Sequence, residues 1–252
     1  MKIVIAPDSF KESLTALEVA EAIETGFKKV FPQAEYVKLP MADGGEGTVQ
    51  SLVDATGGKL VACDVIAPLG NRVKSFFGLS GDGKTAIIEM AAASGLHLVP
   101  KDERNPLNTT SYGTGELIKC ALALGVQHII LGIGGSATND GGVGMLQALG
   151  IRFLNKQHQD IGYGGAQLAE IERIDTGALD NRLAQVHIEV ACDVNNPLCG
   201  ERGASAIFGP QKGATPQMVA QLDAALAHFA EIAQRDCGKN IKDQAGAGAA
   251  GG

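Results

Sequence analysis

A glycine-rich stretch in the middle of the chain has the composition of an anion-binding turn. The sequence Gly132-Ile-Gly-Gly-Ser-Ala-Thr-Asn-Asp-Gly-Gly142 directly follows an apolar run at 128–131. Glycines let the backbone approach a ligand closely, and consecutive N–H groups can then point at a phosphate or a carboxylate. A tight turn between a strand and a helix is the alternative interpretation. The anion-binding interpretation predicts ligand contacts at Gly134, Gly135, Ser136, Asn139 and Asp140.

Short charged side chains next to other apolar runs could supply the chemistry of phosphoryl transfer. Asp8, Ser9 and Lys11 follow a run at 2–6, and Asp193 follows another. A lysine can neutralise phosphate oxygens, whereas a carboxylate can hold Mg²⁺ or accept the proton of an attacking hydroxyl. We therefore select Lys11, Asp193 and Asp8 as candidate catalytic residues and Ser9 as a phosphate contact. Asp8, Asp193 and the nearby Asp43 could each equally cap a helix or a turn.

Further polar residues complete the candidate site. Asp43 and Glu46 lie in a glycine-rich segment before a predicted helix, and we select them as candidate metal ligands. Thr110 and Ser111 begin another predicted helix, where hydroxyls and free N–H groups suit a second anion contact. An ordinary helix cap explains these two residues almost as well. The cations that could recognise a carboxylate are Arg72, Arg104 and Lys212.

One motif in the sequence imitates a nucleotide-binding loop. Gly78-Leu-Ser-Gly-Asp-Gly-Lys-Thr85 matches the P-loop expression letter for letter. A P-loop must open directly into a helix, whereas Lys84 and Thr85 lead into a β-branched run. Because Asp82-Gly83 between two apolar runs is a strong hairpin signal, we predict a β-hairpin here.

Two other partial motifs favour other classes of enzyme only weakly. Gly132-Ile-Gly-Gly-Ser-Ala137 fits a loose dinucleotide-binding pattern, but the next predicted strand ends without the acidic residue that would hold a ribose. The same segment lacks the second glycine of a serine-hydrolase elbow, and no histidine is tied to Ser136. A protein that only binds a ligand also remains open on spacing alone.

The elements that would position these residues alternate as in α/β proteins. In the first part of the chain Thr15 and Glu18 form a capping-box pattern at the start of a predicted helix. Ligands of open α/β sheets bind beyond the carboxyl ends of strands, which is where Asp8, Lys11 and Asp43 fall. The expected strands are 2–6, 36–39 and 59–65, the expected helices are 15–31 and 44–56, and the buried stripe of the first helix is expected to be Val19, Ala22, Ile23, Phe27 and Val30.

The pattern changes near residue 68 to closely spaced β-runs, so we expect a domain boundary there. A helix is predicted at 113–124 and a long amphipathic helix at 215–237, with Met218, Leu222 and Phe229 on its apolar face. The expected strands of this second part are 73–79, 85–89, 128–131, 151–154 and 187–191.

The composition limits the classes of protein to which the chain can belong. The 252 residues are 45% hydrophobic and 19% charged, which is enough to bury a sizeable core. A net charge of −7 offers no basic surface for nucleic acid or an anionic membrane, so small-molecule substrates are expected. The five cysteines are odd in number and form no Cys-x-x-Cys pair, which favours reduced thiols and a cytoplasmic location. The five histidines are dispersed, and structural zinc is not expected.

Five sequence blocks, in order along the chain, resemble the type-1 glycerate kinase family. The resemblance implies transfer of the γ-phosphoryl of ATP, with Mg²⁺, to a hydroxyl of D-glycerate, and it favours 2-phosphoglycerate over 3-phosphoglycerate as the product. Another small hydroxy-acid or sugar kinase, or a non-catalytic nucleotide-binding protein, is the alternative. The blocks are Pro7-Asp-Ser-Phe-Lys-Glu-Ser-Leu14, Met41-Ala-Asp-Gly-Gly-Glu-Gly-Thr48, residues 132–142, Ala191-Cys-Asp-Val-Asn-Asn-Pro-Leu198 and Gly209-Pro-Gln-Lys-Gly-Ala214.

The resemblance also implies an α/β fold of two domains with the active site between them. Residues 1–68 would be the N-terminal part of a flavodoxin-like, parallel-sheet domain, and residues 69–252 a second, mixed α/β domain. Family members continue beyond Gly252, so we expect the flavodoxin-like domain to be incomplete and the chain to be shortened. The cleft would then be incomplete, with loss of activity as one consequence. The alternative is that residues 246–252 are a disordered tail.

Overall fold

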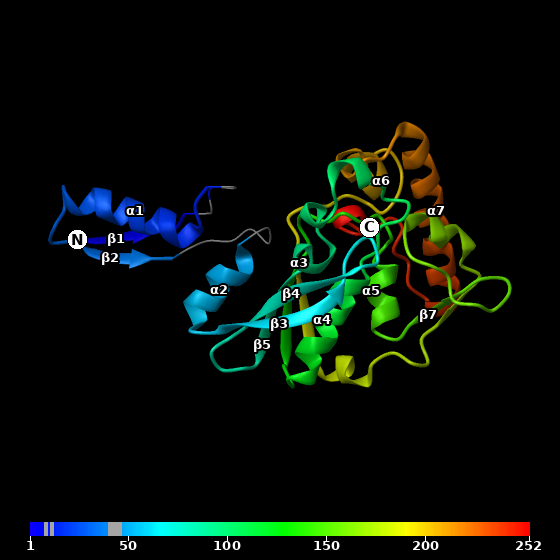
Figure 1. The fold of residues 1–252 in the computed structure, drawn as a ribbon, viewed down its shortest axis with the longest axis horizontal. Helices are drawn as coiled ribbons and strands as arrows, with labels where there is room; N and C mark the ends of the chain where they lie inside the picture. Colours follow the sequence, from blue (N-terminus) through cyan, green and yellow to red (C-terminus); the bar gives the residue numbers. More distant parts are fainter. Residues whose placement is uncertain (8–9, 11–12, 40–46) are drawn as a thin grey trace.

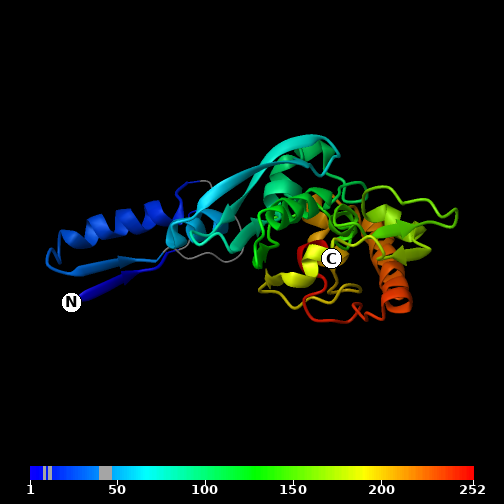
Figure 2. The ribbon, with the colours of Figure 1, turned by 90° about the horizontal axis from the view of Figure 1, so that it is seen from below.

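The computed structural model describes residues 1–7, 10, 13–39 and 47–252. The N-terminal unit consists of strand β1 (Lys2–Ile5), helix α1 (Ala16–Lys28) and strand β2 (Glu35–Lys38). The two strands pair in parallel, with Lys2 opposite Glu35 and Ile5 opposite Lys38. Figures 1 and 2 both show this unit at one end of the molecule, apart from the larger sheet. The predicted β/α/β alternation is therefore confirmed in this unit.

Helix α1 begins where the capping box predicts. The Thr15 side chain accepts a hydrogen bond from the Glu18 N–H at 3.3 Å, and the Thr15 N–H donates to Glu18 Oε2 at 2.8 Å. Ala16, Val19 and Ala20 are buried. The predicted buried stripe is wrong beyond Val19, because Ala22, Ile23, Phe27 and Val30 are exposed, Phe27 by 45%. No described element covers this face of the helix, and sequence periodicity cannot reveal whether a covering partner exists.

The main sheet has five strands in the order β3-β4-β5-β6-β9. Strands β3, β4 and β5 are antiparallel neighbours, whereas β5, β6 and β9 run parallel. The structure therefore corrects the expectation that 59–65 is a third strand of the first β/α unit. The domain boundary at residue 68 stays a prediction. The strands are β3 (Lys59–Ile66), β4 (Arg72–Leu79), β5 (Thr85–Glu89), β6 (His128–Gly132) and β9 (His187–Ala191).

Helices cover the two faces of the main sheet (Figure 1). Helix α2 (Thr48–Thr56) packs Val49 and Val53 against Ile87 of β5. Helix α4 (Tyr112–Ala123) packs on the sheet face opposite to α2. Its Leu117 is buried there, in the largest apolar cluster of the described residues. The short helix α3 (Ala91–Ser94) follows β5. The remaining buried members of this cluster include Val65, Phe77, Ile88, Ile118, Ala121, Ile129 and Leu131.

A second apolar cluster forms around helix α7 (Pro216–Cys237). Its predicted face is confirmed: Leu222, Ala225, Leu226, Phe229 and Ile232 are buried, and Met218 is partly buried. The helix has 22 residues, starts after the Thr215 cap and is ended by the cap residue Gly238, which has a φ of 67°. No described helix, α7 included, is long and apolar enough to cross a membrane. A cytoplasmic location stays a prediction.

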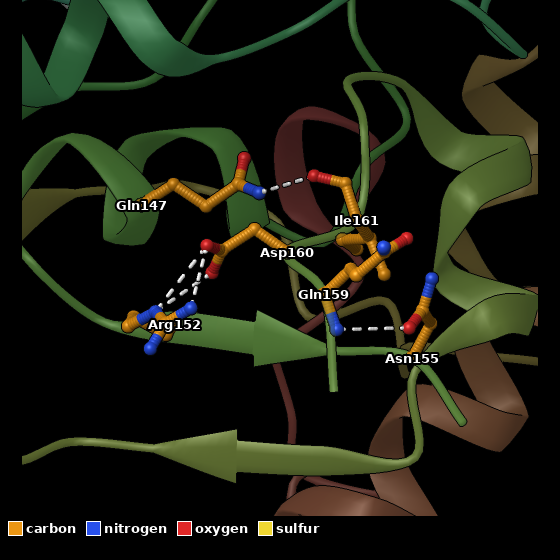
Figure 3. Close-up of polar contacts among 6 residues, drawn as sticks. All are labelled: Gln147, Arg152, Asn155, Gln159, Asp160 and Ile161. Atoms are coloured by element: carbon orange, nitrogen blue, oxygen red, sulfur yellow. Dashed lines mark hydrogen bonds and ion pairs between the residues drawn. The ribbon is translucent and has the colours of Figure 1, made fainter. Parts of the chain in front are cut away.

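A small antiparallel pair, β7 (Arg152–Leu154) and β8 (Arg173–Asp175), lies between α5 (Val143–Ala148) and α7 in sequence. Figure 3 shows the polar contacts that order the turn after β7. The Arg152 guanidinium donates to the Asp160 carboxylate, with its closest N···O distance at 2.8 Å, and Gln147 donates to the Ile161 carbonyl. Asn155 accepts hydrogen bonds from residues of the same turn.

The segment that imitates a P-loop is a hairpin. Strands β4 and β5 flank it, and Ser80 and Thr85 pair through the backbone. The Asp82 carboxylate accepts hydrogen bonds from the Ser80 hydroxyl and the Lys84 N–H, while Gly83 has a φ of 70° that suits glycine. The hairpin prediction is confirmed.

The expectation of five reduced cysteines is wrong for one pair. A disulfide joins Cys63 of β3 to Cys120 of α4, whose Cα atoms are 6.9 Å apart. The two residues are separated by 57 positions, and only the packing of α4 on β3 brings them together. Cys192, Cys199 and Cys237 are free.

Short elements complete the chain between these strands and helices. Helix α6 (Ala204–Phe208) lies against α7. The 3₁₀ helices are η1 (Leu96–Leu98), η2 (Lys101–Glu103), η3 (Gly165–Glu170), η4 (Asn181–Gln185), η5 (Pro210–Lys212) and η6 (Ala249–Gly251).

Candidate functional site

The carboxyl ends of three parallel strands meet at one edge of the main sheet. Glu89, the last residue of β5, is paired with Gly132 of β6, and Gly132 is paired with Ala191 of β9. The glycine-rich turn after β6 and Asp193 after β9 therefore leave the sheet at the same edge. This is the location at which open α/β sheets bind ligands.

The glycine-rich turn is exposed at Gly134 and Gly135 and buried from Ser136 to Asp140. Gly135 has a φ of 73°, a conformation that side chains disfavour. The Gly135 carbonyl accepts a hydrogen bond from the Leu96 N–H, and the Ala137 N–H donates to the Ser94 carbonyl. Within the described part of the chain, the N–H groups of Gly134 and Gly135 donate no hydrogen bond. They are therefore available to an anion.

The side chains at 136 and 139 hold a distant segment of the chain. The Asn139 amide donates to the Gly251 carbonyl at 2.9 Å, and the Ser136 hydroxyl donates to the Ala250 carbonyl. Ser136 and Asn139 are buried, and so are Ala249 and Gly251. In the structure residues 246–252 are packed and include η6, which differs from the alternative of a disordered tail.

Lys212 is the buried cation of this arrangement, with only 1% of its surface exposed. Its ammonium donates to the Ser136 hydroxyl at 2.7 Å, to the Ala250 carbonyl at 2.6 Å and to the Thr138 carbonyl. Burial lowers the pKa of Lys212 to about 7, and the nearby Asp140 carboxylate opposes this shift. The lysine thus connects the glycine-rich turn to the segment at 246–252.

Asp140 joins the starts of two helices. Its Oδ2 atom accepts hydrogen bonds from the Ser111 N–H at 2.9 Å, the Ser111 hydroxyl at 2.8 Å and the Gly144 N–H at 3.3 Å. Burial raises the pKa of this carboxyl group, and the hydrogen bonds from Ser111 and Gly144 oppose the rise. Thr110, also buried, accepts a hydrogen bond from the Tyr112 N–H at 3.2 Å. These contacts position α4 and α5, and a direct ligand role for the three residues stays a prediction.

A hollow of about 220 Å³ lies between these parts. Its walls come from the glycine-rich turn, the starts of α4 and α5, the end of β6 and the segment at 246–252. The lining includes Ser111, Thr114, Leu131, Thr138, Asp140, Met145, Val190, Ala249 and Ala250. The structure therefore brings Ser111 and Asp140 to the wall of one hollow, whereas Asp193 is exposed at the end of β9.

Five predicted site residues lie outside the described residues: Asp8, Ser9, Lys11, Asp43 and Glu46. Their roles stay predictions. Helix α2 begins at Thr48, the last residue of the second sequence block, and the Val49 N–H donates to the buried carboxylate of Glu89 at 2.8 Å. Helix α2 therefore starts beside the carboxyl end of β5.

The comparisons with known proteins identify the family. A model of the glycerate kinase family matches residues 3–252. The chain belongs to the glycerate kinase family. The resemblance found in the five sequence blocks is confirmed.

Relatives with known names match this chain along its whole length. It is 82% identical to a glycerate kinase of Haemophilus influenzae and 58% identical to a glycerate 2-kinase of Escherichia coli, covering 67% and 66% of those proteins. A crystal structure attributed to a glycerate kinase 2 of Salmonella typhimurium LT2 superimposes with a TM-score of 0.95 at 62% identity. That match covers all of this chain and 67% of the solved one. The chain spans about two thirds of the length of the curated relatives that it matches.

The structure reveals contacts of Lys212 and Glu89 in this glycerate kinase site that the sequence did not indicate. Lys212 was one of three candidate cations in the sequence, and its position in the fifth family block was the signal that could have singled it out. Glu89 was not selected, although an acidic residue at the end of a predicted strand could have been noted. Arg72 instead pairs with Glu116 at 3.5 Å, and the buried Nε of Arg104 has no hydrogen-bond partner among the described residues.

Proposed function

We propose that the protein phosphorylates a hydroxyl of D-glycerate with ATP and Mg²⁺. Family membership supports glycerate and a nucleotide as substrates. The observation that carries the proposal to this chain is the exposed turn at Gly134 and Gly135, whose N–H groups are available at the carboxyl edge of three parallel strands. A phosphate of ATP or the carboxylate of glycerate would be bound there.

Phosphoryl transfer requires little covalent catalysis from the protein. A phosphoryl transfer needs its reactants held in line and its negative charge neutralised. In our proposal the glycine-rich turn binds and orients an anionic group, Asp193 or Asp8 accepts the hydroxyl proton, and Lys11 neutralises phosphate oxygens. Ser136, Asn139 and Lys212 keep the shape of the turn, since Lys212 donates to Ser136 and to the Ala250 carbonyl and the Asn139 amide nitrogen donates to the Gly251 carbonyl.

The donor set at this edge fits Mg²⁺, which prefers oxygen ligands and is commonly held by one or two carboxylates together with substrate phosphates. Asp193 is an exposed carboxylate at the edge and fits this role, with Asp43 and Glu46 as the further proposed ligands. Asp140 fits less well, because one of its oxygens already accepts three hydrogen bonds. When bound, Mg²⁺ would neutralise phosphate charge.

We further propose 2-phosphoglycerate as the product. The support is the relative from Escherichia coli that is named a glycerate 2-kinase and is 58% identical over 252 residues. The two hydroxyls of glycerate differ in position by only a few bond lengths, so product analysis must decide between them.

The test is release of ADP from ATP, in the presence and absence of Mg²⁺ and of D-glycerate, by the 252-residue chain and by a version extended to the length of its relatives. We expect glycerate-stimulated release from at least the extended protein, with 2-phosphoglycerate formed. Stimulation by a different hydroxy acid alone, or no release from either protein, would overturn the proposal.

A matched pair of variants assigns the role of Asp193 in whichever of these proteins is active. Asp193→Asn should lower the turnover rate by at least about 100-fold, as expected for loss of a general base. Asp64→Asn, which alters an exposed carboxylate on β3, should leave turnover unchanged. Equal rates for the two variants would remove Asp193 from the mechanism.

A further inference from the structure

Two histidines that are far apart in the sequence lie side by side at the amino ends of β6 and β9. His128 and His187 are the first residues of these parallel strands and are paired directly with each other. Their ring centroids are 5.2 Å apart. Paired residues of neighbouring parallel strands point to the same face, and so do residues two apart on one strand. Glu189 therefore joins the two histidines on one face of the sheet.

The three side chains are close enough to bind one ion. One ligand atom of each residue lies within 4.8 Å of those of the other two. His128 Nε2 and Glu189 Oε2 are 3.3 Å apart. With metal–ligand bonds of about 2.0–2.2 Å, two ligands of a tetrahedral ion are separated by about 3.3–3.6 Å. The separation of this pair is therefore already at the tetrahedral value, and a rotation of the exposed His187 side chain would complete the set.

One nitrogen of the set lacks a hydrogen-bond partner. His128 Nε2 is buried and forms no hydrogen bond within the described part of the chain, although the Glu189 carboxylate is at ion-pair distance. A buried polar atom without a partner carries a free-energy cost that a metal ligand bond would remove. His187 and Glu189 are exposed, so an ion can enter from solvent.

The cluster is separate from the candidate functional site. His128 begins β6, whereas the glycine-rich turn follows the other end of the same strand at Gly132. Four steps along a strand correspond to about 13 Å. A hollow of about 480 Å³ borders His128 on its own side of the sheet and is lined by residues that include Thr85, Ile87 and Ile130.

We propose that His128, His187 and Glu189 form a binding site for a late first-row divalent cation, of which Zn²⁺ is the natural representative. Two imidazoles and one carboxylate are the donors that zinc accepts, and they leave a position open for water. Mg²⁺ prefers oxygen ligands only, so the site would not compete with phosphoryl transfer for its metal. Although the histidines have no metal-ligand spacing in the sequence, the parallel pairing of β6 with β9 creates it.

The test is a Zn²⁺ titration of the metal-free 252-residue chain by calorimetry, without nucleotide. Cys192→Ser and Cys237→Ser form the background, because these exposed thiols could bind zinc themselves. We expect one equivalent of Zn²⁺ to bind, a rise in melting temperature with added Zn²⁺ through mass action, and a tetrahedral visible spectrum with Co²⁺.

Two variants and one control decide the ligands. His187→Asn and Glu189→Gln alter exposed side chains and should each weaken Zn²⁺ binding at least tenfold, a loss seen even when an outer-shell partner is removed. His158→Asn replaces an exposed histidine whose φ of 61° suits asparagine, and it should leave the affinity unchanged. Circular dichroism establishes that the variants fold. Absence of Zn²⁺ binding, or the same affinity in all three variants, would overturn the proposal.

Discussion

Helices α1 and α7 carry the same kind of amphipathic pattern but end in different environments. Helix α7 buries Ala225, Leu226 and Phe229 in the second apolar cluster, whereas α1 leaves Ile23 and Phe27 exposed. Both helices start at a threonine cap. The difference shows that local signals place a helix, while its burial depends on partners that are distant in the sequence.

The contrast has an energetic meaning. Full burial of an isoleucine or phenylalanine side chain contributes about 1.5–3 kcal/mol. The exposed face of α1 leaves a substantial part of this contribution unrealised, because Ile23 is 36% and Phe27 45% exposed, and the buried residues of the helix are the small Ala16, Val19 and Ala20. The N-terminal unit should therefore open more readily than the main sheet.

The largest effect on stability is expected from a substitution in the apolar core around α7. Leu226 is fully buried, so Leu226→Ala should lower the free energy of unfolding by about 2–5 kcal/mol. Ile23→Ala on α1 should cost less than about 1 kcal/mol, because that side chain is 36% exposed. Urea denaturation followed by circular dichroism measures both. If Ile23→Ala cost as much as Leu226→Ala, the proposed difference between the two regions would be wrong.

A smaller effect is expected from the buried lysine. Lys212→Met removes the donor shared by the Ser136 hydroxyl and the carbonyls of Thr138 and Ala250, and unsatisfied buried groups cost about 1–3 kcal/mol. Hydrogen exchange should become faster in residues 246–252, which this lysine holds. Lys239→Met, at an exposed position beyond α7, is the control and should leave exchange unchanged.

The same lysine should make stability depend on pH in a defined direction. Its pKa falls from 10.5 to about 7 on folding, because burial disfavours the charged form. Between these values the unfolded chain binds more protons than the folded chain, so this group's contribution to stability rises with pH from about 7 to 10.5. Denaturation midpoints of the wild-type chain minus those of Lys212→Met should rise across this window. A flat or falling difference would contradict the lowered pKa.

The smallest effect is expected at the hairpin that imitates a P-loop. Lys84→Ala should leave the affinity for ATP unchanged, since Lys84 follows a turn closed by Asp82 and Ser80 and precedes a strand. Equilibrium binding of a fluorescent ATP analogue to the wild type and the variant measures this. A loss of more than tenfold in a folded Lys84→Ala protein would restore the P-loop interpretation.

The sequence predicted best what short segments decide by themselves. The capping box at Thr15, the hairpin turn at Asp82 and the boundaries of β9 depend on neighbouring residues, and all three are confirmed. Neither the antiparallel pairing of β3 with β4 nor the disulfide of Cys63 was foreseen, because both depend on packing between elements.

The candidate site divides in the same way. The glycine-rich turn was recognisable from composition, and its position at a carboxyl edge followed from the strand before it. The contacts of Lys212 could not be predicted, since they join residues 74 and 76 positions away along the chain. The roles of Asp8, Lys11 and Asp43 stay predictions.

The docking of residues 249–252 on the glycine-rich turn has a consequence for the order of folding. Ser136 and Ala250 are separated by 114 positions, so their contact closes one of the long loops of the chain. Contacts of such high sequence separation form slowly, because the entropy of loop closure is lost before the contact contributes. During synthesis the turn at 132–142 therefore emerges long before its final hydrogen-bond partners, and the site should take its shape among the last steps of folding.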